Sequence, residues 1–216
     1  MPDRTSPSPA HLLLQIGAIG IEQGEPFTFA SGLTSPMYCD NRLFLSRPAE
    51  RKEIVERLCA LIEELAGDEW DAVAGVASSG IPFAAWIVAR FDKPMVYVRP
   101  AEKDHGRKRQ VEGGLAAGKR VALVEDLVTT GGSAVAAVSA LRDAGYVCNY
   151  CVSIFDYGFA AASEAFRENG IEHKTLTDFD RVVPVLHERG QASDADVERL
   201  KRWHEHADAS GVAVSA

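Results

Sequence analysis

Long hydrophobic runs and an excess of positive charge are both missing from this sequence, and each absence excludes a class of protein. No apolar stretch approaches the roughly 18 residues that cross a bilayer, so we expect neither a transmembrane helix nor a membrane partner. The chain has 23 Lys and Arg residues against 31 Asp and Glu residues, for a net charge of −8. This acidic balance argues against a general nucleic-acid surface, although a local basic patch is compatible with it.

Cysteine is scarce as well, which excludes a scaffold built on disulfides. The 216 residues include 4 cysteines, so a reducing cytoplasm is the simplest expected location. Cys148 and Cys151 form an isolated C-x-x-C, but zinc would need further ligands and none is suitably spaced, which favours a structural role. The apolar stretch 12–21 lacks a basic leading region and a convincing cleavage site, so we do not expect a signal peptide.

The length of the chain fits one α/β domain with extensions better than two full domains. The Pro- and Ser-rich start, 1–10, is expected to be disordered, and 207–216 is expected to be a loose tail. Between them, 11–48 indicates a short helix followed by β-structure and turns, and 49–206 indicates the core.

Helical patterns alternate with apolar strands through this core. The expected helices are 49–67, 78–91, 133–144 and 159–170, and the expected strands are 71–77, 93–100, 121–126, 147–155 and 171–179. The strands are apolar throughout rather than alternating, which is typical of a parallel sheet covered by helices on both faces. In such sheets ligands bind at the carboxyl ends of the strands.

The end of the strand at 121–126 has the densest cluster of residues that could bind a ligand. Glu125 and Asp126 close the strand, and residues 129–133, Thr-Thr-Gly-Gly-Ser, lead into a helix. Glycines that permit a tight turn, hydroxyl donors and a helix N-terminus together favour a phosphate site. The spacing matches neither a Walker A loop nor G-x-G-x-x-G.

The two acids point to a second part of the same ligand. A phosphate held directly against Glu125 and Asp126 would be repelled, so the carboxylates are expected to face something else. A ribose diol, which donates hydrogen bonds to carboxylates, and Mg²⁺, which takes few protein ligands and many phosphate oxygens, both fit. The plainer alternative is a helix cap with solvated acids, which the contiguity of these residues disfavours.

A basic segment interrupts the otherwise acidic chain. It contains Lys103, His105, Arg107, Lys108 and Arg109. The usual interpretation of such a run is a solvated loop. The sharper one is a lid that meets a highly charged substrate, since Gly106 and the pair at 113–114 permit movement.

These motifs resemble the type I phosphoribosyltransferases, and within them the orotate phosphoribosyltransferases, over roughly residues 26–180. The segment 121–138 is similar to the phosphoribosyl-diphosphate (PRPP) motif, 27–42 to the base-binding hood, 73–86 to the diphosphate loop, and 97–113 to the mobile catalytic loop. The resemblance implies a central parallel sheet flanked by helices, with a small N-terminal hood at 11–48 and a mobile loop at 99–114. It implies pentosyl transfer from PRPP to orotate in pyrimidine biosynthesis. A different base specificity, a nucleotide-sensing regulatory relative that binds RNA, and an inactive scaffold dimer are the alternatives.

The resemblance also implies roles for individual residues. Lys103, His105 and Asp126 would be catalytic. Tyr38, Cys39 and Thr129 would bind orotate. PRPP would be bound by Ser78, Ser79, Arg99, Lys103, His105, Glu125, Asp126, Leu127, Val128, Thr129, Thr130, Gly131, Gly132 and Ser133. Mg²⁺ would be the cofactor, held mainly by substrate and without a direct protein ligand. The partners would be the two substrates and a second copy of the chain in a homodimer with shared active sites, with no nucleic acid.

Several positions depart from what some relatives carry. Ala30, Thr34 and Pro100 stand where some have lysine, and no arginine lies near Tyr157, where some bind the orotate carboxylate. The partner of that carboxylate is therefore not identified by the resemblance. Arg107, Lys108 and Arg109 are interpreted as solvated or peripheral. In the C-terminal helix, Trp203, His204 and His206 are interpreted as surface or packing residues, because an i, i+2 spacing splays side chains apart.

Overall fold

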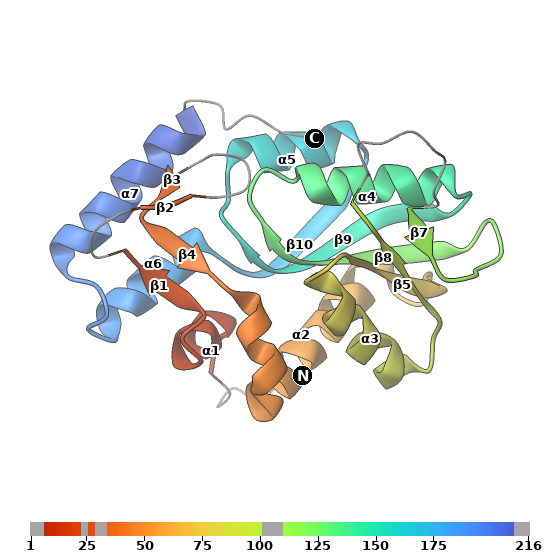
Figure 1. Ribbon diagram of the computed structural model, residues 1–216, viewed down its shortest axis with the longest axis horizontal. Helices are drawn as coiled ribbons and strands as arrows, with labels where there is room; N and C mark the ends of the chain where they lie inside the picture. Colours follow the sequence, from red (N-terminus) through yellow and green to blue (C-terminus); the bar gives the residue numbers. More distant parts are fainter. Residues whose placement is uncertain (1–6, 23–25, 29–33, 101–109, 210–216) are drawn as a thin grey trace.

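A six-stranded sheet, in the order β10-β9-β8-β5-β6-β7, forms the centre of the molecule in this computed structural model (Figure 1). The structure describes residues 7–22, 26–28, 34–100 and 110–209. The strands are β1 (Ile19–Ile21), β2 (Phe27–Thr28), β3 (Thr34–Ser35), β4 (Met37–Cys39), β5 (Ala72–Val76), β6 (Met95–Val98), β7 (Val111–Glu112), β8 (Arg120–Val128), β9 (Val147–Asp156) and β10 (Glu172–Asp178). The helices are α1 (Pro9–Gln15), the 3₁₀-helix η1 (Asn41–Ser46), α2 (Pro48–Ala66), α3 (Gly80–Phe91), α4 (Gly132–Asp143), α5 (Ala160–Glu168), α6 (Phe179–Glu188) and α7 (Asp194–Ala209).

The sheet is parallel except at one edge, which confirms the predicted α/β class. β10, β9, β8, β5 and β6 pair in parallel, whereas β7 pairs antiparallel to β6. β7 falls in the stretch 99–114, where the resemblance implies a mobile loop. Two residues are too few to produce a recognisable strand pattern, and only the pairing with β6 makes them a strand.

Helices cover both faces of the sheet, which explains why its central strand β5 is apolar along its whole length, whereas the edge strand β10 is largely polar. In Figure 1, α4 and α5 lie above the sheet, and α2 and α3 lie below it. All five residues of β5 are buried. Successive side chains alternate between the faces: Val73 packs in the core shared with α2 and α3, whereas Ala72 and Ala74 pack in the core under α4 and α5.

The main differences from the expected helices are two boundaries and one whole helix. α1 begins at Pro9, inside the stretch 1–10 expected to be disordered, because the Ser8 side chain accepts a hydrogen bond from His11 N and proline suits a first turn. α7 continues to Ala209, past the boundary expected at 206. α6 was not predicted, although Asp178 caps it by accepting a hydrogen bond from Arg181 N.

The N-terminal strands form a small layer, here called the hood, against the end of the core. β1 pairs with β4, and β2 pairs with β3, both antiparallel. The Tyr157 hydroxyl donates to Met37 O at 3.2 Å, and Trp203 Nε1 donates to Thr34 O at 2.8 Å. These bonds fix the hood against β9 and α7 and so position it over the carboxyl edge of the sheet. No helix in the described part of the chain is long and apolar enough to cross a membrane.

The C-terminal aromatic residues contribute to packing. His204 stacks on Phe159 and Phe179, with ring centroids 4.9 and 4.3 Å apart, and its Nε2 lies 2.6 Å from Tyr157 O. Trp203 contacts the same rings, whereas His206 is exposed. The interpretation of Trp203 and His204 as packing residues matches these contacts.

Candidate active site

A cleft of about 690 Å³ opens where the hood meets the carboxyl ends of β5, β6 and β8. It collects residues from segments that are far apart in the sequence. Of the residues proposed from the sequence, the structure brings these to the cleft wall: Tyr38, Cys39, Ser78, Ser79, Arg99, Glu125, Asp126, Leu127, Gly132 and Ser133.

The loop between β8 and α4 has the backbone geometry of an anion site. Gly131 has φ +76°, a left-handed conformation that favours glycine, and α4 begins at the next residue. The first N–H groups of a helix have no intrahelical acceptor and carry partial positive charge. Ser133 lies exposed in this first turn and lines the cleft. The loop can therefore accept a phosphate group at this helix N-terminus.

Four residues of this loop proposed from the sequence do not line the cleft. Val128 and Thr130 are buried, and Thr129 is half-buried. A Cβ atom added to Gly131 would lie 3.5 Å from the backbone of Ala162. The loop is thus supported from behind by α5, and these residues shape its path.

The two acids at the end of β8 lie in an environment that favours their neutral forms. Glu125 is only 6% exposed, and its Oε1 accepts a hydrogen bond of 3.1 Å from Asp126 N. Burial raises the pKa of Glu125 well above its usual range, and the charge of Asp126 adds to the effect. Burial also raises the pKa of Asp126. Such a pair can accept hydrogen bonds from ligand hydroxyls, and its protonated member can also donate one.

The turn between β5 and α3 lies directly beside this acid pair. Ala77 N donates to Val98 O at 2.8 Å, and the peptide bond between Ala77 and Ser78 is cis. At Gly80 an added Cβ atom would lie 2.5 Å from Val124 O. Glycine is therefore required where the start of α3 touches the backbone of β8, and this contact sets the distance between the serine turn and the acids.

The hood contributes a polar wall that follows β4. The Tyr38 ring packs against Phe27, with centroids 5.3 Å apart, and its hydroxyl accepts a hydrogen bond of 3.0 Å from Arg42 Nη2. Cys39 is buried, which raises the pKa of its thiol well above its usual value. Asn41 Nδ2 donates to Asp126 O at 2.7 Å and joins the hood to the acid pair.

Three of these hood residues, Asp40, Asn41 and Arg42, were not singled out from the sequence. The sequence did contain a signal for them. They form a polar run at the end of the segment 27–42, which resembles the base-binding hood. Asp40 and Arg42 line the cleft, and Arg42 donates to both Asp40 carboxylate oxygens, at 2.6 and 3.0 Å. Hydrogen bonds from Arg42, assisted by its charge, keep the pKa of Asp40 below its usual value.

Arg99 marks the opposite side of the cleft. It follows β6, its backbone N–H donates to Gln110 O at 2.9 Å, and its guanidinium lies 3.2 Å from Glu112 of β7. Lys103 and His105, proposed as catalytic, lie outside the described residues.

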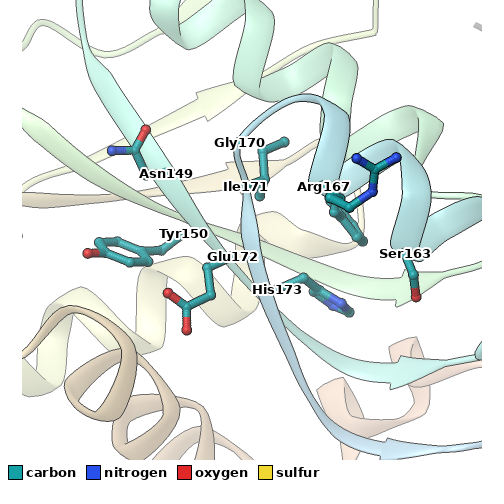
Figure 2. A pocket seen from close by; sticks show the side chains of 9 residues that line it. Asn149, Tyr150, Ser163, Arg167, Gly170, Ile171, Glu172 and His173 are labelled. Carbon is teal, nitrogen blue, oxygen red and sulfur yellow. The ribbon is translucent and has the colours of Figure 1, made fainter.

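A second concavity lies at the opposite end of the sheet, near the amino ends of β9 and β10 (Figure 2). It measures about 710 Å³, and Asn149, Arg167 and Glu172 border it. Its most buried polar group, His173, stacks on Phe166 with centroids 4.5 Å apart, and its Nε2 lies 2.9 Å from Ser153 Oγ. Burial lowers the pKa of His173 to about 4. This histidine is committed to neighbouring side chains, so the cleft under the hood is the better candidate.

Comparison with known proteins gives the family. Residues 45–164 match the phosphoribosyl transferase domain family. The chain is 42% identical to the orotate phosphoribosyltransferase of Staphylococcus saprophyticus over 197 residues, which cover 91% of this chain and 97% of that protein. The chain belongs to the orotate phosphoribosyltransferases. This confirms the family resemblance inferred from the motifs.

Other relatives agree across nearly the full length. The enzyme of the same name from Listeria monocytogenes is 42% identical over 202 residues, covering 94% of this chain and 96% of that protein. Among solved structures, orotate phosphoribosyltransferase from Aeropyrum pernix matches with a TM-score of 0.72 and 31% identity, covering 85% of this chain and 99% of that chain. The fold class predicted from the alternating pattern, a central parallel sheet with flanking helices, is therefore that of the family.

Proposed function

We propose that this protein transfers the 5-phosphoribosyl group of PRPP to orotate, giving orotidine 5′-monophosphate and diphosphate in de novo pyrimidine biosynthesis. The observation that carries the proposal is the cleft in which an anion-binding loop, a pair of acids and a hood meet. The 42% identity to enzymes named orotate phosphoribosyltransferase, over more than nine-tenths of the chain, supports the same activity.

We assign the two ends of the ribose phosphate to neighbouring parts of one segment, the end of β8 and the loop that leads into α4. The 5′-phosphate is held by the 129–133 loop at the N-terminus of α4, where Gly132 and Ser133 line the cleft and the first N–H groups of the helix favour an anion. Glu125 and Asp126 accept hydrogen bonds from the ribose hydroxyls. Leu127 and Val128 hold the connection between the two subsites at the end of β8.

We assign the diphosphate to the opposite wall of the cleft. Ser78 and Ser79 in the turn before α3 and Arg99 at the end of β6 line that wall and offer N–H, hydroxyl and guanidinium donors. Lys103 and His105 lie in the segment that follows Arg99, and we propose that they also contact the diphosphate. Orotate then lies on the hood side, against the backbone of Tyr38 and Cys39 and beside Thr129.

The donor set of the cleft fits Mg²⁺ carried by the substrate. Among the described residues, no three His, Cys, Asp or Glu side chains come together as a metal site. Mg²⁺ is usually held by one or two carboxylates together with substrate phosphates, and Glu125 and Asp126 can supply that limited share. When bound with PRPP, Mg²⁺ offsets negative charge on the departing diphosphate.

The reaction requires no protein nucleophile. The C1′–O bond to diphosphate breaks and its electrons remain on the leaving oxygen. The ring nitrogen of orotate forms the new bond to C1′, and the proton it carried is released with the diphosphate. The residues facing diphosphate stabilise its growing charge, which is the largest contribution expected from the protein. Asp126, beside the ribose, responds to positive charge that develops on the sugar.

We also propose a cytoplasmic homodimer in which the 99–114 loop of one subunit reaches the site of the other. The acidic chain and the four free, buried cysteines are compatible with the reducing compartment. Sedimentation velocity of the purified protein tests the dimer.

The activity is tested by following the loss of orotate absorbance in the presence of PRPP and Mg²⁺. Turnover with orotate, abolished by EDTA, is expected. Turnover with uracil or a purine, but none with orotate, would assign a different base. Salt-sensitive RNA binding without turnover would favour a regulatory relative.

A further inference from the structure

Two residues on the hood wall of the cleft have no assigned role in the proposed reaction. They are Asp40 and Arg42, which lie beside Tyr38 and Cys39. We propose that Arg42 binds the carboxylate of orotate and thereby sets the preference for this base over pyrimidines that lack the carboxylate. The inference rests on the proposed function and adds a specificity-determining residue to it.

The chemistry of orotate requires such a partner. Its carboxylate is ionised at neutral pH, and a carboxylate that leaves water needs hydrogen-bond donors or a cation. The cleft already holds three carboxyl side chains, at Asp40, Glu125 and Asp126. Among the described residues that line it, the positively charged ones are Arg42 and Arg99.

The position of Arg99 suits the diphosphate better than the base. It follows β6, which is separated from β8 by β5. With strands about 4.8 Å apart, β6 lies roughly 10 Å from β8. Arg42 is on the β8 side, since its neighbour Asn41 donates a hydrogen bond to Asp126 O. The charge of Arg42 also reaches the Asp126 carboxyl and opposes the rise in its pKa.

The guanidinium of Arg42 is oriented before any ligand binds. Its Nε and Nη2 donate to the two oxygens of Asp40 at 2.6 and 3.0 Å, and Nη2 also donates to Tyr38 Oη at 3.0 Å. These bonds use three of the five N–H groups that a guanidinium carries. The other two are on Nη1, for which the described residues provide no partner. The side chain is 59% exposed, so this edge is accessible to a carboxylate.

The negative charge of Asp40 makes binding of the orotate carboxylate by Arg42 depend on the geometry of the hydrogen bonds. Asp40 offsets much of the positive charge of Arg42, so directed hydrogen bonds rather than net charge must hold the substrate. A lysine has no planar fork and cannot bind Asp40, Tyr38 and a substrate carboxylate in the same arrangement. Arg42→Lys is therefore expected to restore little of the affinity for orotate.

The test compares orotate with its methyl ester, which has the same ring but no negative charge. In Arg42→Gln, the KM for orotate should rise roughly 10- to 100-fold, the range for losing hydrogen bonds to a charged group. The KM for PRPP and the inhibition constant of methyl orotate should stay close to those of the wild type. Arg47→Gln is the matched control, because Arg47 is an exposed arginine at the end of η1 that does not line the cleft.

Each outcome decides the inference. Selective loss of orotate binding supports it. An unchanged KM for orotate, or equal losses for orotate and its ester, would show that Arg42 only supports the hood, and would overturn it. A wild-type protein that binds PRPP but does not use orotate would overturn the proposed function itself, and this result is separate from any effect of Arg42.

Discussion

Asn41 Nδ2 donates a hydrogen bond of 2.7 Å to the backbone carbonyl of Asp126, a residue 85 positions later in the chain. Asn41 is only 1% exposed, and its Oδ1 lies 3.7 Å from Cys39 Sγ, within reach of the thiol donor. One side chain therefore joins the hood that we assign to the base and the acid that we assign to the ribose. We therefore expect the relative position of the two substrates to depend on this bond.

Asn41→Ala is expected to loosen this junction. The carbonyl of Asp126 would lose its donor in a poorly hydrated place, which costs about 1–3 kcal/mol of unfolding free energy. We expect kcat/KM to fall as well, since the hood and the acid pair would no longer be held together. Urea unfolding and steady-state kinetics measure the two effects. Asn149→Ala, at an exposed position of β9, is the control; equal behaviour of the two variants would contradict this role.

Gly80→Ala is expected to disturb the diphosphate side of the cleft. The new methyl group would lie 2.5 Å from Val124 O, so α3 or β8 must shift. Overpacking of this kind typically costs about 1–3 kcal/mol, and the shift would move the Ser78–Ser79 turn away from Glu125. We expect a lower melting temperature and a higher KM for PRPP. At Gly20, where an added Cβ atom meets nothing within 4 Å, the same substitution should be tolerated. A Gly80 variant as stable and active as Gly20→Ala would argue against the close contact.

Asp126→Asn is expected to affect PRPP more than orotate. The substitution keeps the size and the backbone hydrogen bonds but removes an acceptor and the charge that would face the ribose. Loss of a hydrogen bond between ligand and charged group is worth roughly 10- to 100-fold in KM for PRPP. Asp143→Asn, on an exposed residue at the end of α4, serves as the control. The ribose assignment fails if orotate and PRPP are affected equally.

Glu125→Gln should change how stability depends on pH. Burial raises the pKa of Glu125 above the 4.5 of an unperturbed glutamate, so the folded protein keeps a proton that the unfolded chain releases. This contribution to stability is fully present below about pH 4.5 and is lost as the pH rises through the folded-state pKa. Glutamine resembles the protonated form and does not titrate. The variant should therefore gain unfolding free energy relative to the wild type as the pH rises, by up to about 1.4 kcal/mol per pH unit.

The measurement for Glu125→Gln is urea unfolding of both proteins between about pH 5 and pH 8. Glu188→Gln, at an exposed position near the end of α6, should give a difference that does not change with pH. A pH-independent difference for Glu125→Gln would mean that the carboxyl is ionised throughout this range in the fold.

Local chemistry was enough to predict most strands and helices, and the tight turn between β8 and α4 that we assign to phosphate. The buried run of β8, the Thr-Thr-Gly-Gly-Ser turn and the start of α4 are contiguous in the sequence. Each can therefore be predicted from the local preferences of its own residues. α6 was missed because Pro184 lies inside it. Proline has no backbone N–H for a helix hydrogen bond, so its presence in a sequence argues against a helix. β7 was missed because its two residues become a strand only beside β6.

The sequence indicated which residues form the hood, but it did not indicate where the hood lies relative to the sheet. That Asn41 meets Asp126, that Tyr157 donates to Met37 O, and that Arg42 lies on the cleft wall are results of packing between distant segments. The periodicity of apolar residues shows which face of a helix or strand is buried, but it gives no information about the distances between elements. The phosphoribosyl chemistry was therefore predictable from one contiguous stretch, whereas the residue that we propose to face the base could be identified only from the position of the hood at the end of the sheet.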